Sequence, residues 1–336
     1  MMSKFINNRA SLCYDDVLIV PSHSTIESRS HCDTSVNITT LTAHHHFKIP
    51  IMAANMDTIC GPKMASKMDD LGGIGIIHRN CPIEQITSPS FVAVGSLRND
   101  KERIDKVIEA GHNICVDIAH GHSVNMQITL EYIRNRIASN KIIIAGNVCT
   151  QRGCNDLSKW GANIVKVGVG GGSACTTRIK TGCGVPQFQA VLDCADTGIP
   201  IIADGGIRHA GDAAKALAAG AKFVMIGGML AGTDYTPDWN IEIASLGGYI
   251  SYRGMASMDA KASTGLRLEH EEGVSVKVKA RPQGSTEAVI KDLVDGIKSA
   301  MSYSGECTLD EFAESAKFCI VTSQTQKENQ AHIHVK

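Results

Sequence analysis

Residues 164–175 read Ile-Val-Lys-Val-Gly-Val-Gly-Gly-Gly-Ser-Ala-Cys, a short and mostly apolar run followed by a glycine-rich stretch that ends at Cys175. A continuous apolar run bounded by turn residues is typical of a strand buried on both faces. Glycine adopts dihedral angles that other residues avoid, so such a stretch lets backbone groups approach a ligand or an ion. The segment therefore predicts a buried strand that leads into a binding loop carrying a thiol.

The same kind of apolar run recurs along the chain, and segments of helical length, such as 187–196 and 211–220, fill most of the intervals. In the second of these segments Ala214, Leu217 and Ala218 share one helical face, and Gly220 is suited to end the helix. Buried strands alternating with helices predict an α/β fold, an eight-stranded parallel (β/α)8 TIM barrel. The runs are 51–54, 74–77, 92–95, 114–118, 142–145, 164–167, 201–203 and 223–226.

The length of 336 residues suits a single catalytic barrel domain, because such barrels typically occupy about 250 residues. We expect that domain to span 1–336 without a regulatory insert. After the eighth strand, a charged segment at about 252–280 predicts a flap over the barrel mouth, and 286–301 predicts a helix. A polar tail is expected at about 323–336.

Composition limits the classes of partner. The chain has 33 basic and 34 acidic side chains, and no basic cluster is interleaved with aromatic residues, so we expect no nucleic-acid partner. No apolar run approaches the roughly 20 residues of a membrane helix, and the chain does not begin with a secretory leader pattern. These features predict a soluble, cytoplasmic protein that does not bind a membrane.

The twelve cysteines are scattered and include no Cys-x-x-Cys pair, which argues against a disulfide framework and a zinc site. Cys115, Cys149 and Cys194 are predicted to be buried free thiols. Residues 44–46 are three consecutive histidines, whose side chains would alternate in direction on an extended segment. We interpret them as a solvated loop and predict no site in which side chains chelate a metal.

Barrels of this kind carry their chemistry at the carboxyl ends of the strands. Gly205-Gly206 follows the seventh strand and Gly227-Gly228 the eighth, where barrels commonly bind phosphate through backbone amides. A flavin mononucleotide site and simple tight turns are the alternatives for these glycines. A dinucleotide fingerprint is disfavoured in the loop before Cys175, because its third glycine position is occupied by Ser173. The functional segments are expected at 55–58, 117–123, 168–178, 204–207 and 227–232.

The loop Gly-x-Gly-x-Gly-Ser-x-Cys-Thr-Thr-Arg at 168–178, followed by Thr-Gly-x-Gly-x-Pro-Gln at 181–187, resembles the active-site loop of the IMP dehydrogenase and GMP reductase family. Further blocks similar to that family follow in its order, so the resemblance extends from about residue 14 to residue 302. These blocks are 14–18, 54–58, 72–78, 117–123 and 145–148.

The resemblance implies a role for individual residues. Cys175 would be the nucleophile, and Thr177 and Glu272 would transfer protons. The nucleotide would be bound by Ser173, Asp204, Gly205, Gly206, Gly227, Gly228, Met255 and Ala256. The cofactor would contact Asp117, Asn147, Ser299 and Tyr303, the last two in a neighbouring subunit of a homotetramer. A potassium ion would be coordinated by carbonyls of Gly170, Gly172 and Cys175.

The two activities of the family share an attack of the cysteine on C2 of the purine and differ in the flap. By resemblance, the dehydrogenase activates water with an Arg-Tyr pair, but no such pair follows Gly254-Met255. The connection between 77–81 and 91–95 is also too short for the usual regulatory insert. The resemblance therefore implies NADPH-dependent reductive deamination of GMP to IMP and ammonia through a covalent thioimidate, a step of purine nucleotide interconversion.

Two alternatives stay open: an IMP dehydrogenase without its regulatory domain, and a non-catalytic barrel that binds purine nucleotides. The joint presence of Cys175, Thr177 and Glu272 argues against the second. The flap departs from mammalian-type reductases at Glu269, where those enzymes carry an arginine. The nearest arginine in this chain is Arg267.

Overall fold

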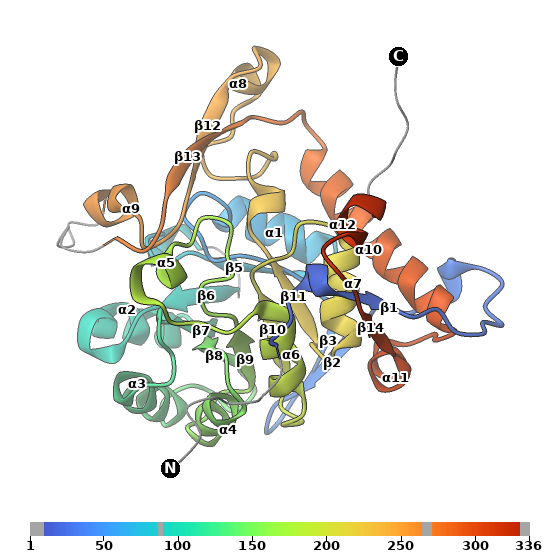
Figure 1. Cartoon of the computed structure of the whole chain (residues 1–336). Helices are drawn as coiled ribbons and strands as arrows, with labels where there is room; N and C mark the ends of the chain where they lie inside the picture. The colour runs from blue at the N-terminus through green and yellow to red at the C-terminus, as the bar shows by residue number, and fades with distance from the viewer. Residues whose placement is uncertain (1–9, 87–89, 264–270, 330–336) are drawn as a thin grey trace.

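The computed structural model describes residues 10–86, 90–263 and 271–329. Its centre is a closed barrel of eight parallel strands, in which β11 pairs with β4 to complete the ring (Figure 1). The predicted TIM barrel is confirmed, and each predicted apolar run overlaps one of its strands. The strands are β4 (Ile51–Ala53), β5 (Ile74–Ile77), β6 (Phe91–Val94), β7 (Asn113–Asp117), β8 (Ile143–Val148), β9 (Ile164–Val167), β10 (Ile201–Asp204) and β11 (Phe223–Ile226).

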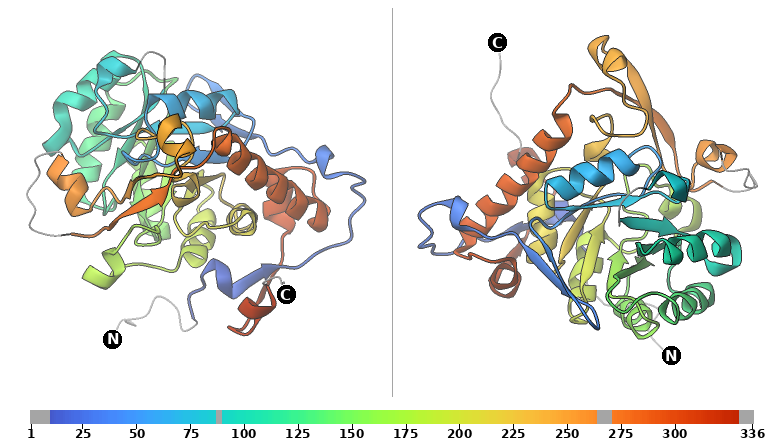
Figure 2. Two further views of the ribbon diagram at one scale, coloured as in Figure 1. Left: turned by 90° about the horizontal axis from the view of Figure 1, so that it is seen from above. Right: turned by 180° about the vertical axis from the view of Figure 1, so that it is seen from behind.

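Helices cover the outside of the barrel (Figures 1 and 2). Two of them begin at a side-chain cap: the Ser123 side chain accepts the Met126 N–H, and the Thr150 side chain accepts the Gly153 N–H. The outer helices are α1 (Pro62–Asp70), α2 (Leu97–Glu109), α3 (Val124–Arg134), α4 (Gln151–Lys159), α6 (Gln187–Ala195), α7 (Ala210–Ala218) and α10 (Ser285–Ser304).

Helix α7 shows how the small residues are used. Ala214, Leu217 and Ala218 are buried, as their helical spacing predicts, and α10 packs against the same helix. A Cβ on Gly296 of α10 would lie 2.3 Å from the Ala210 Cβ, so the small residues allow close helix packing. Gly220 follows the end of the helix with φ +99°, a left-handed conformation that favours glycine.

The amino-terminal end of the barrel is covered by a hairpin of β2 (Val36–Thr39) and β3 (His44–Phe47). The Phe47 ring contacts Phe223 with a centroid separation of 5.5 Å and Phe91 with 6.3 Å. The prediction that 44–46 form a solvated loop is therefore wrong. Pairing with β2 and the ring contacts of the partly buried Phe47 at the strand end hold the histidines in an edge strand, where His44 and His46 remain exposed.

Both ends of the described chain pack beside the barrel. Strand β1 (Val17–Ile19) pairs antiparallel with β14 (Phe318–Ile320), which joins the two terminal regions. The remaining short elements are η1 (Tyr14–Asp16), η2 (Arg29–His31), η3 (Ile83–Gln85), η4 (Gly228–Leu230), α5 (Thr177–Thr181), α11 (Leu309–Ser315) and α12 (Thr325–Glu328). None of the helices in the described ranges combines the length and the apolar character needed to cross a bilayer.

All twelve cysteines are free thiols. Cys115 and Cys194 are buried, as predicted, whereas Cys149 at the end of β8 is only partly buried. Its position after the strand explains the difference, because the loop that it starts reaches the barrel surface.

The flap rises from the carboxyl end of the barrel as an antiparallel pair, β12 (Tyr249–Arg253) and β13 (Ser275–Lys279) (Figures 1 and 2). It also carries α8 (Ile241–Ser245) and α9 (Met258–Ser263). The hairpin begins before the expected start at 252, because Tyr249 already pairs with Lys279. Arg267 and Glu269 lie outside the described residues.

Candidate active site

The loop after β9 presents Cys175 at the carboxyl end of the barrel. Arg178 folds back along this loop, where its Nε donates to the Val169 carbonyl at 3.0 Å and its Nη2 to the Val185 carbonyl at 2.5 Å. Gly170 has φ +75°, and a Cβ there would lie 2.4 Å from the Arg178 Cγ. Glycine is required because it adopts this dihedral and leaves room for the arginine stem.

The flap contacts the cysteine loop through its backbone. The Thr176 N–H donates to the Glu272 carbonyl at 2.9 Å, and an isolated antiparallel bridge joins Cys175 to Gly273. These contacts bring a residue of the flap next to a loop that lies far away in the sequence. As a result, the Glu272 side chain faces the same region as the thiol.

Cys175, Thr177 and Glu272 form a continuous hydrogen-bonded chain. The Cys175 Sγ donates to the Thr177 Oγ1 at 3.1 Å, and the Thr177 hydroxyl donates to the Glu272 Oε2 at 2.8 Å. A carboxylate linked to a thiol through one hydroxyl can accept the proton of that thiol. By contrast, the neighbouring Glu271 accepts the Met258 N–H at 3.2 Å. The geometry thus favours Glu272, and not Glu271, as the carboxylate that is hydrogen-bonded to Thr177.

Two glycine turns converge on Ser173. The Ser173 Oγ lies 2.8 Å from the Tyr252 hydroxyl, and a Cβ on Gly228 would come within 2.9 Å of the serine oxygen. A Cβ on Gly205 would lie 2.9 Å from the carbonyl carbon of Gly171. The turns after β10 and β11 therefore approach the cysteine loop closely, and the glycines leave a cradle with hydroxyl groups at its edge.

Tyr252 is a residue of this cradle that the sequence reasoning missed. A Cβ on Gly227 would lie 3.7 Å from the Tyr252 hydroxyl, so this hydroxyl reaches the turn after β11. In the turn after β10, Gly206 has φ +78°. Burial raises the pKa of Tyr252, although the hydrogen bond with Ser173 opposes the shift, so the hydroxyl stays protonated. The signal in the sequence is weak: strand β12 alternates exposed and buried positions, and Tyr252 occupies a buried one.

A buried lysine joins two carboxylates at the barrel mouth. The Lys166 Nζ lies 2.7 Å from the Asp117 Oδ1 and 3.1 Å from the Asp204 Oδ2. The lysine side chain is 3% exposed, and those of Asp117 and Asp204 are 25% and 22% exposed. The ammonium is thus enclosed, while both carboxylates reach the open end of the barrel.

Amides complete this network. The Asn55 Nδ2 donates to the Asp117 Oδ2 at 2.9 Å, and the Asn147 Nδ2 donates to the Asp204 Oδ2 at 2.8 Å. Burial alone would raise the pKa of Asp117, but the Lys166 charge and the hydrogen bonds from Lys166 and Asn55 outweigh it and lower that pKa. Burial likewise opposes the charge of Lys166, yet the two carboxylates raise its pKa. Asp117 and Lys166 are therefore both charged at neutral pH.

The predicted base-binding residues lie between the flap and the loop after β4. The Asp57 N–H contacts the Met255 Sδ at 3.3 Å, and the Ala256 carbonyl accepts the Glu272 N–H at 3.2 Å. Arg253 anchors this part of the flap, because its Nη2 and Nε lie 2.7 and 3.2 Å from the two carboxylate oxygens of Asp57. Such a two-point contact fixes orientation as well as distance.

Ser299 and Tyr303 are not brought to this site within the chain. Both lie on α10, on the opposite side of the barrel from α5 and α9 (Figures 1 and 2). The Ser299 Oγ already accepts a hydrogen bond from the Arg29 Nη1 at 3.0 Å, whereas Tyr303 is 68% exposed.

Among the residues expected to coordinate potassium, the Gly172 carbonyl accepts the Cys175 N–H at 3.0 Å.

Comparison with known proteins places these features in a family. The chain matches the IMP dehydrogenase / GMP reductase domain over residues 11–89 and 90–332. An IMP dehydrogenase of Cryptosporidium parvum is 35% identical over 387 aligned residues, which cover 96% of this chain and 94% of that protein. A GMP reductase of Vibrio atlanticus is 34% identical, with 95% of this chain and 97% of that protein covered.

A solved structure is similar over almost the whole chain. It is a cysteine-to-alanine variant of the GMP reductase of Trypanosoma brucei in complex with guanosine 5′-monophosphate. The TM-score is 0.87 and the sequence identity is 27%, with 97% of this chain and 98% of that chain covered. The likeness therefore extends over the barrel and the flap together.

Proposed function

The chain belongs to the IMP dehydrogenase / GMP reductase family, and from this premise we propose that it is an NADPH-dependent GMP reductase. It would convert GMP to IMP and ammonia. The hydrogen-bonded chain of Cys175, Thr177 and Glu272 is the observation that supports this chemistry best, because it joins a nucleophile to a proton acceptor.

The reaction begins at the thiol. A free cysteine has a pKa of about 8.5 and is mostly protonated at neutral pH, so its proton must be accepted for attack. Glu272 accepts it through the Thr177 hydroxyl while the Cys175 sulfur bonds to C2 of GMP. The protonated Glu272, acting through the Thr177 hydroxyl as a proton relay, then supplies a proton to the exocyclic amine. The C2–N bond breaks and releases ammonia. A cysteine thioimidate at C2 remains.

Reduction completes the reaction. NADPH supplies the hydride that C2 of the thioimidate requires. The C2–S bond then breaks, which gives IMP and returns the cysteine as a thiolate, and this thiolate takes up a proton from water. Arg253 and Asp57 position the flap over this step, because they hold the segment before Met255 against the barrel.

The glycine turns supply the phosphate site in this proposal. Gly205, Gly206, Gly227 and Gly228 leave space for a 5′-phosphate, and the Ser173 and Tyr252 hydroxyls lie at its edge as donors. The Asp204 carboxylate keeps acceptor capacity for ribose hydroxyls. Met255 and the backbone of Ala256 would contact the base.

The residues present fit the cofactors implied by the family. Asp117 is partly exposed and charged, so it can accept hydrogen bonds from a nicotinamide cofactor beside Asn147. Tyr303 is exposed and Ser299 lies on the same helix, so both would complete the cofactor site of a neighbouring subunit in a homotetramer. Carbonyls of Gly170, Gly172 and Cys175 provide the oxygen chemistry that potassium prefers.

IMP dehydrogenase is the second candidate, because a dehydrogenase relative is 35% identical over nearly the whole chain. The absence of an Arg-Tyr pair after Gly254-Met255 argues for the reductase, since water activation would lack those groups. The discriminating test follows nicotinamide absorbance with GMP plus NADPH and, separately, with IMP plus NAD. GMP-dependent NADPH oxidation with release of ammonia supports the reductase. Formation of XMP from IMP and NAD without that oxidation would overturn it.

A further inference from the structure

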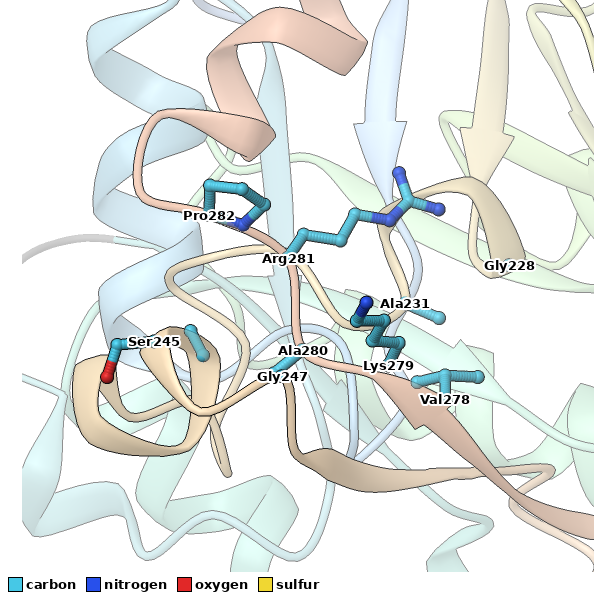
Figure 3. Close-up of a pocket in the computed structure, with 10 residues that line it drawn as sticks. Gly228, Ala231, Ser245, Gly247, Val278, Lys279, Ala280, Arg281 and Pro282 are labelled. Atoms are coloured by element: carbon cyan, nitrogen blue, oxygen red, sulfur yellow. The ribbon is translucent and has the colours of Figure 1, made fainter.

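A cavity whose lining includes Gly228 lies next to the predicted phosphate site (Figure 3). Its volume is about 630 Å³, within the range of about 300–1,000 Å³ that is typical of small-molecule sites. Gly228 is the one residue that it shares with the predicted phosphate cradle, since neither Ser173 nor Tyr252 lines it. The cavity is therefore separate from the nucleotide site.

Two cations line this cavity without a compensating carboxylate. Lys279 and Arg281 come from the end of β13 and the residues after it, and no Asp or Glu occurs among the described lining residues. Neither cation forms an ion pair within the described ranges of the chain. In Figure 3 the Arg281 side chain extends toward the Gly228 turn. Positive charge without a counterion in a concave site favours an anionic ligand.

Hydrogen bonds anchor the backbone of the segment that carries both cations. The Arg281 N–H donates to the Gly232 carbonyl at 2.7 Å, and the Arg281 carbonyl accepts the Trp239 Nε1–H at 2.9 Å. A Cβ on Gly247 would lie 3.9 Å from the Lys279 Nζ, so the lysine amine rests beside that glycine. The site is thus built on anchored backbone rather than on a free chain end.

Apart from Ser245 and two glycines, the other lining side chains are apolar. They are alanine, valine and proline side chains, namely Ala231, Ala244, Val278, Ala280 and Pro282. An inorganic anion alone would leave most of this surface and volume unused. A ligand that combines a phosphate group with an organic moiety matches both the cations and the apolar wall.

We propose that this cavity is a second binding site for a phosphorylated small molecule of nucleotide size, in which Lys279 and Arg281 bind the phosphate groups. The guanidinium suits two-point contact with phosphate oxygens, and the ammonium adds a second positive charge. The proposal concerns binding only and does not depend on which reaction the barrel catalyses.

The test is calorimetric titration of the full chain with GTP and with inorganic pyrophosphate, in the presence of saturating GMP. We expect GTP to bind and pyrophosphate to bind more weakly, because pyrophosphate lacks the organic moiety. The double variant Lys279→Ala/Arg281→Ala should lose at least about tenfold in GTP affinity, because it removes both charged donors to the phosphate groups. Arg281→Lys, which keeps the charge, should lose less.

Matched variants locate the binding. Lys277→Ala removes the same charge from the same strand at a position that does not line the cavity, and it should bind GTP like the wild type. Ser173→Ala/Tyr252→Phe removes the hydroxyl donors of the other site and should also retain GTP binding. Absence of GTP binding to the wild type, or binding lost in the Ser173/Tyr252 variant and kept in the Lys279/Arg281 variant, would overturn the proposal.

Discussion

Thr177 illustrates how much a single residue contributes by its place between two others. Its hydroxyl accepts from the thiol at 3.1 Å and donates to a carboxylate at 2.8 Å, so one rotatable group connects both partners. A direct contact between thiol and carboxylate would leave no such intermediate for proton transfer.

Cys175→Ala is expected to abolish GMP-dependent NADPH oxidation while GMP still binds. The substitution removes the nucleophile, and a small-for-small change in a loop should change the free energy of unfolding by less than about 1 kcal/mol. Steady-state assays and GMP titration measure the two effects. Cys183→Ala, which removes an exposed thiol from the following loop, is the control and should retain activity. Substantial turnover by Cys175→Ala would rule out covalent catalysis at this position.

Glu272→Gln is expected to lower kcat by about 10²–10⁴-fold, the usual contribution of general acid–base catalysis. Glutamine keeps the shape and can still hydrogen bond to Thr177, but it cannot accept the thiol proton. Glu271→Gln is the matched control, because Glu271 bonds to the Met258 N–H instead of the relay. If the Glu271 variant were the slower of the two, the assignment of the carboxylate would be wrong by one residue.

At the scale of elements, the site depends on turns that follow neighbouring strands. The turns after β10 and β11 reach the loop after β9, and β12 adds the Tyr252 hydroxyl from above. Parallel strands end at the same edge, so residues separated by long helices meet there. Glycine in these turns matters for the space that it leaves, which a substitution can test directly.

Gly228→Ala is expected to raise the KM for GMP by about 10- to 100-fold, the cost of losing one or two hydrogen bonds to a charged group. The added Cβ would lie 2.9 Å from the Ser173 Oγ and 3.5 Å from the Tyr252 hydroxyl, within the space of the phosphate. Gly211→Ala in α7 is the control, because a Cβ there meets nothing within 4 Å. Initial-rate kinetics with GMP and with guanosine measure the effect. An unchanged KM, or equal turnover of guanosine, would show that Gly228 serves only the turn.

At the scale of the whole molecule, one buried ion network connects the strands beneath the site. Lys166 on β9 contacts Asp117 on β7 and Asp204 on β10, so three strands of the barrel meet at one ammonium. Replacement of one partner in such a network leaves uncompensated buried charge. The network therefore contributes to stability and to the position of two candidate binding residues.

Lys166→Met is expected to lower the free energy of unfolding by about 3–5 kcal/mol at pH 7, the typical cost of breaking a buried ion pair. In the wild type the pKa of Asp117 is lowered, so its contribution is present above about pH 3.9 and lost as the pH falls below that value. In the variant, burial would raise that pKa instead, and the difference from wild type should shrink between pH 7 and pH 5. Urea unfolding at both values measures this change.

Lys159→Met is the control for that experiment. Lys159 is 74% exposed and lies 3.9 Å from the Asp156 carboxylate, so its loss should cost less than about 1 kcal/mol at either pH. A Lys166→Met penalty that grew as the pH fell would contradict the proposed role of the lysine charge.

The subunit arrangement can be tested by mixing variants. Tyr303 is expected to act on the site of a neighbouring subunit, so Tyr303→Ala should raise the KM for NADPH. Hybrid oligomers of Tyr303→Ala and Cys175→Ala chains would contain sites with both an intact cysteine and an intact neighbouring tyrosine. Activity per intact Cys175 should therefore exceed that of Tyr303→Ala alone. Mixing with a Cys175→Ala/Tyr303→Ala chain is the control, and equal activity in both mixtures would place Tyr303 outside a shared site.

The sequence by itself determined the barrel and the main loop of the candidate site. Continuous apolar runs report strands buried on both faces, and the motif at 168–178 is contiguous, so both are visible without tertiary structure. For residues 44–46, the three consecutive histidines predict a solvated loop, whereas pairing with β2 and the ring contacts of Phe47 place them in a strand. Local pattern cannot reveal which distant segment supplies the hydrogen bonds of an edge strand.

Contacts between distant residues were decided only by the tertiary structure. The Thr177 and Glu272 side chains are 95 residues apart in the sequence, and Ser173 and Tyr252 are 79 residues apart. Neither Tyr252 nor Arg281 carried a local signal strong enough to assign a role. Hydrogen bonds and ion pairs depend on separations of about 3 Å, and packing of whole strands and flap segments sets those separations.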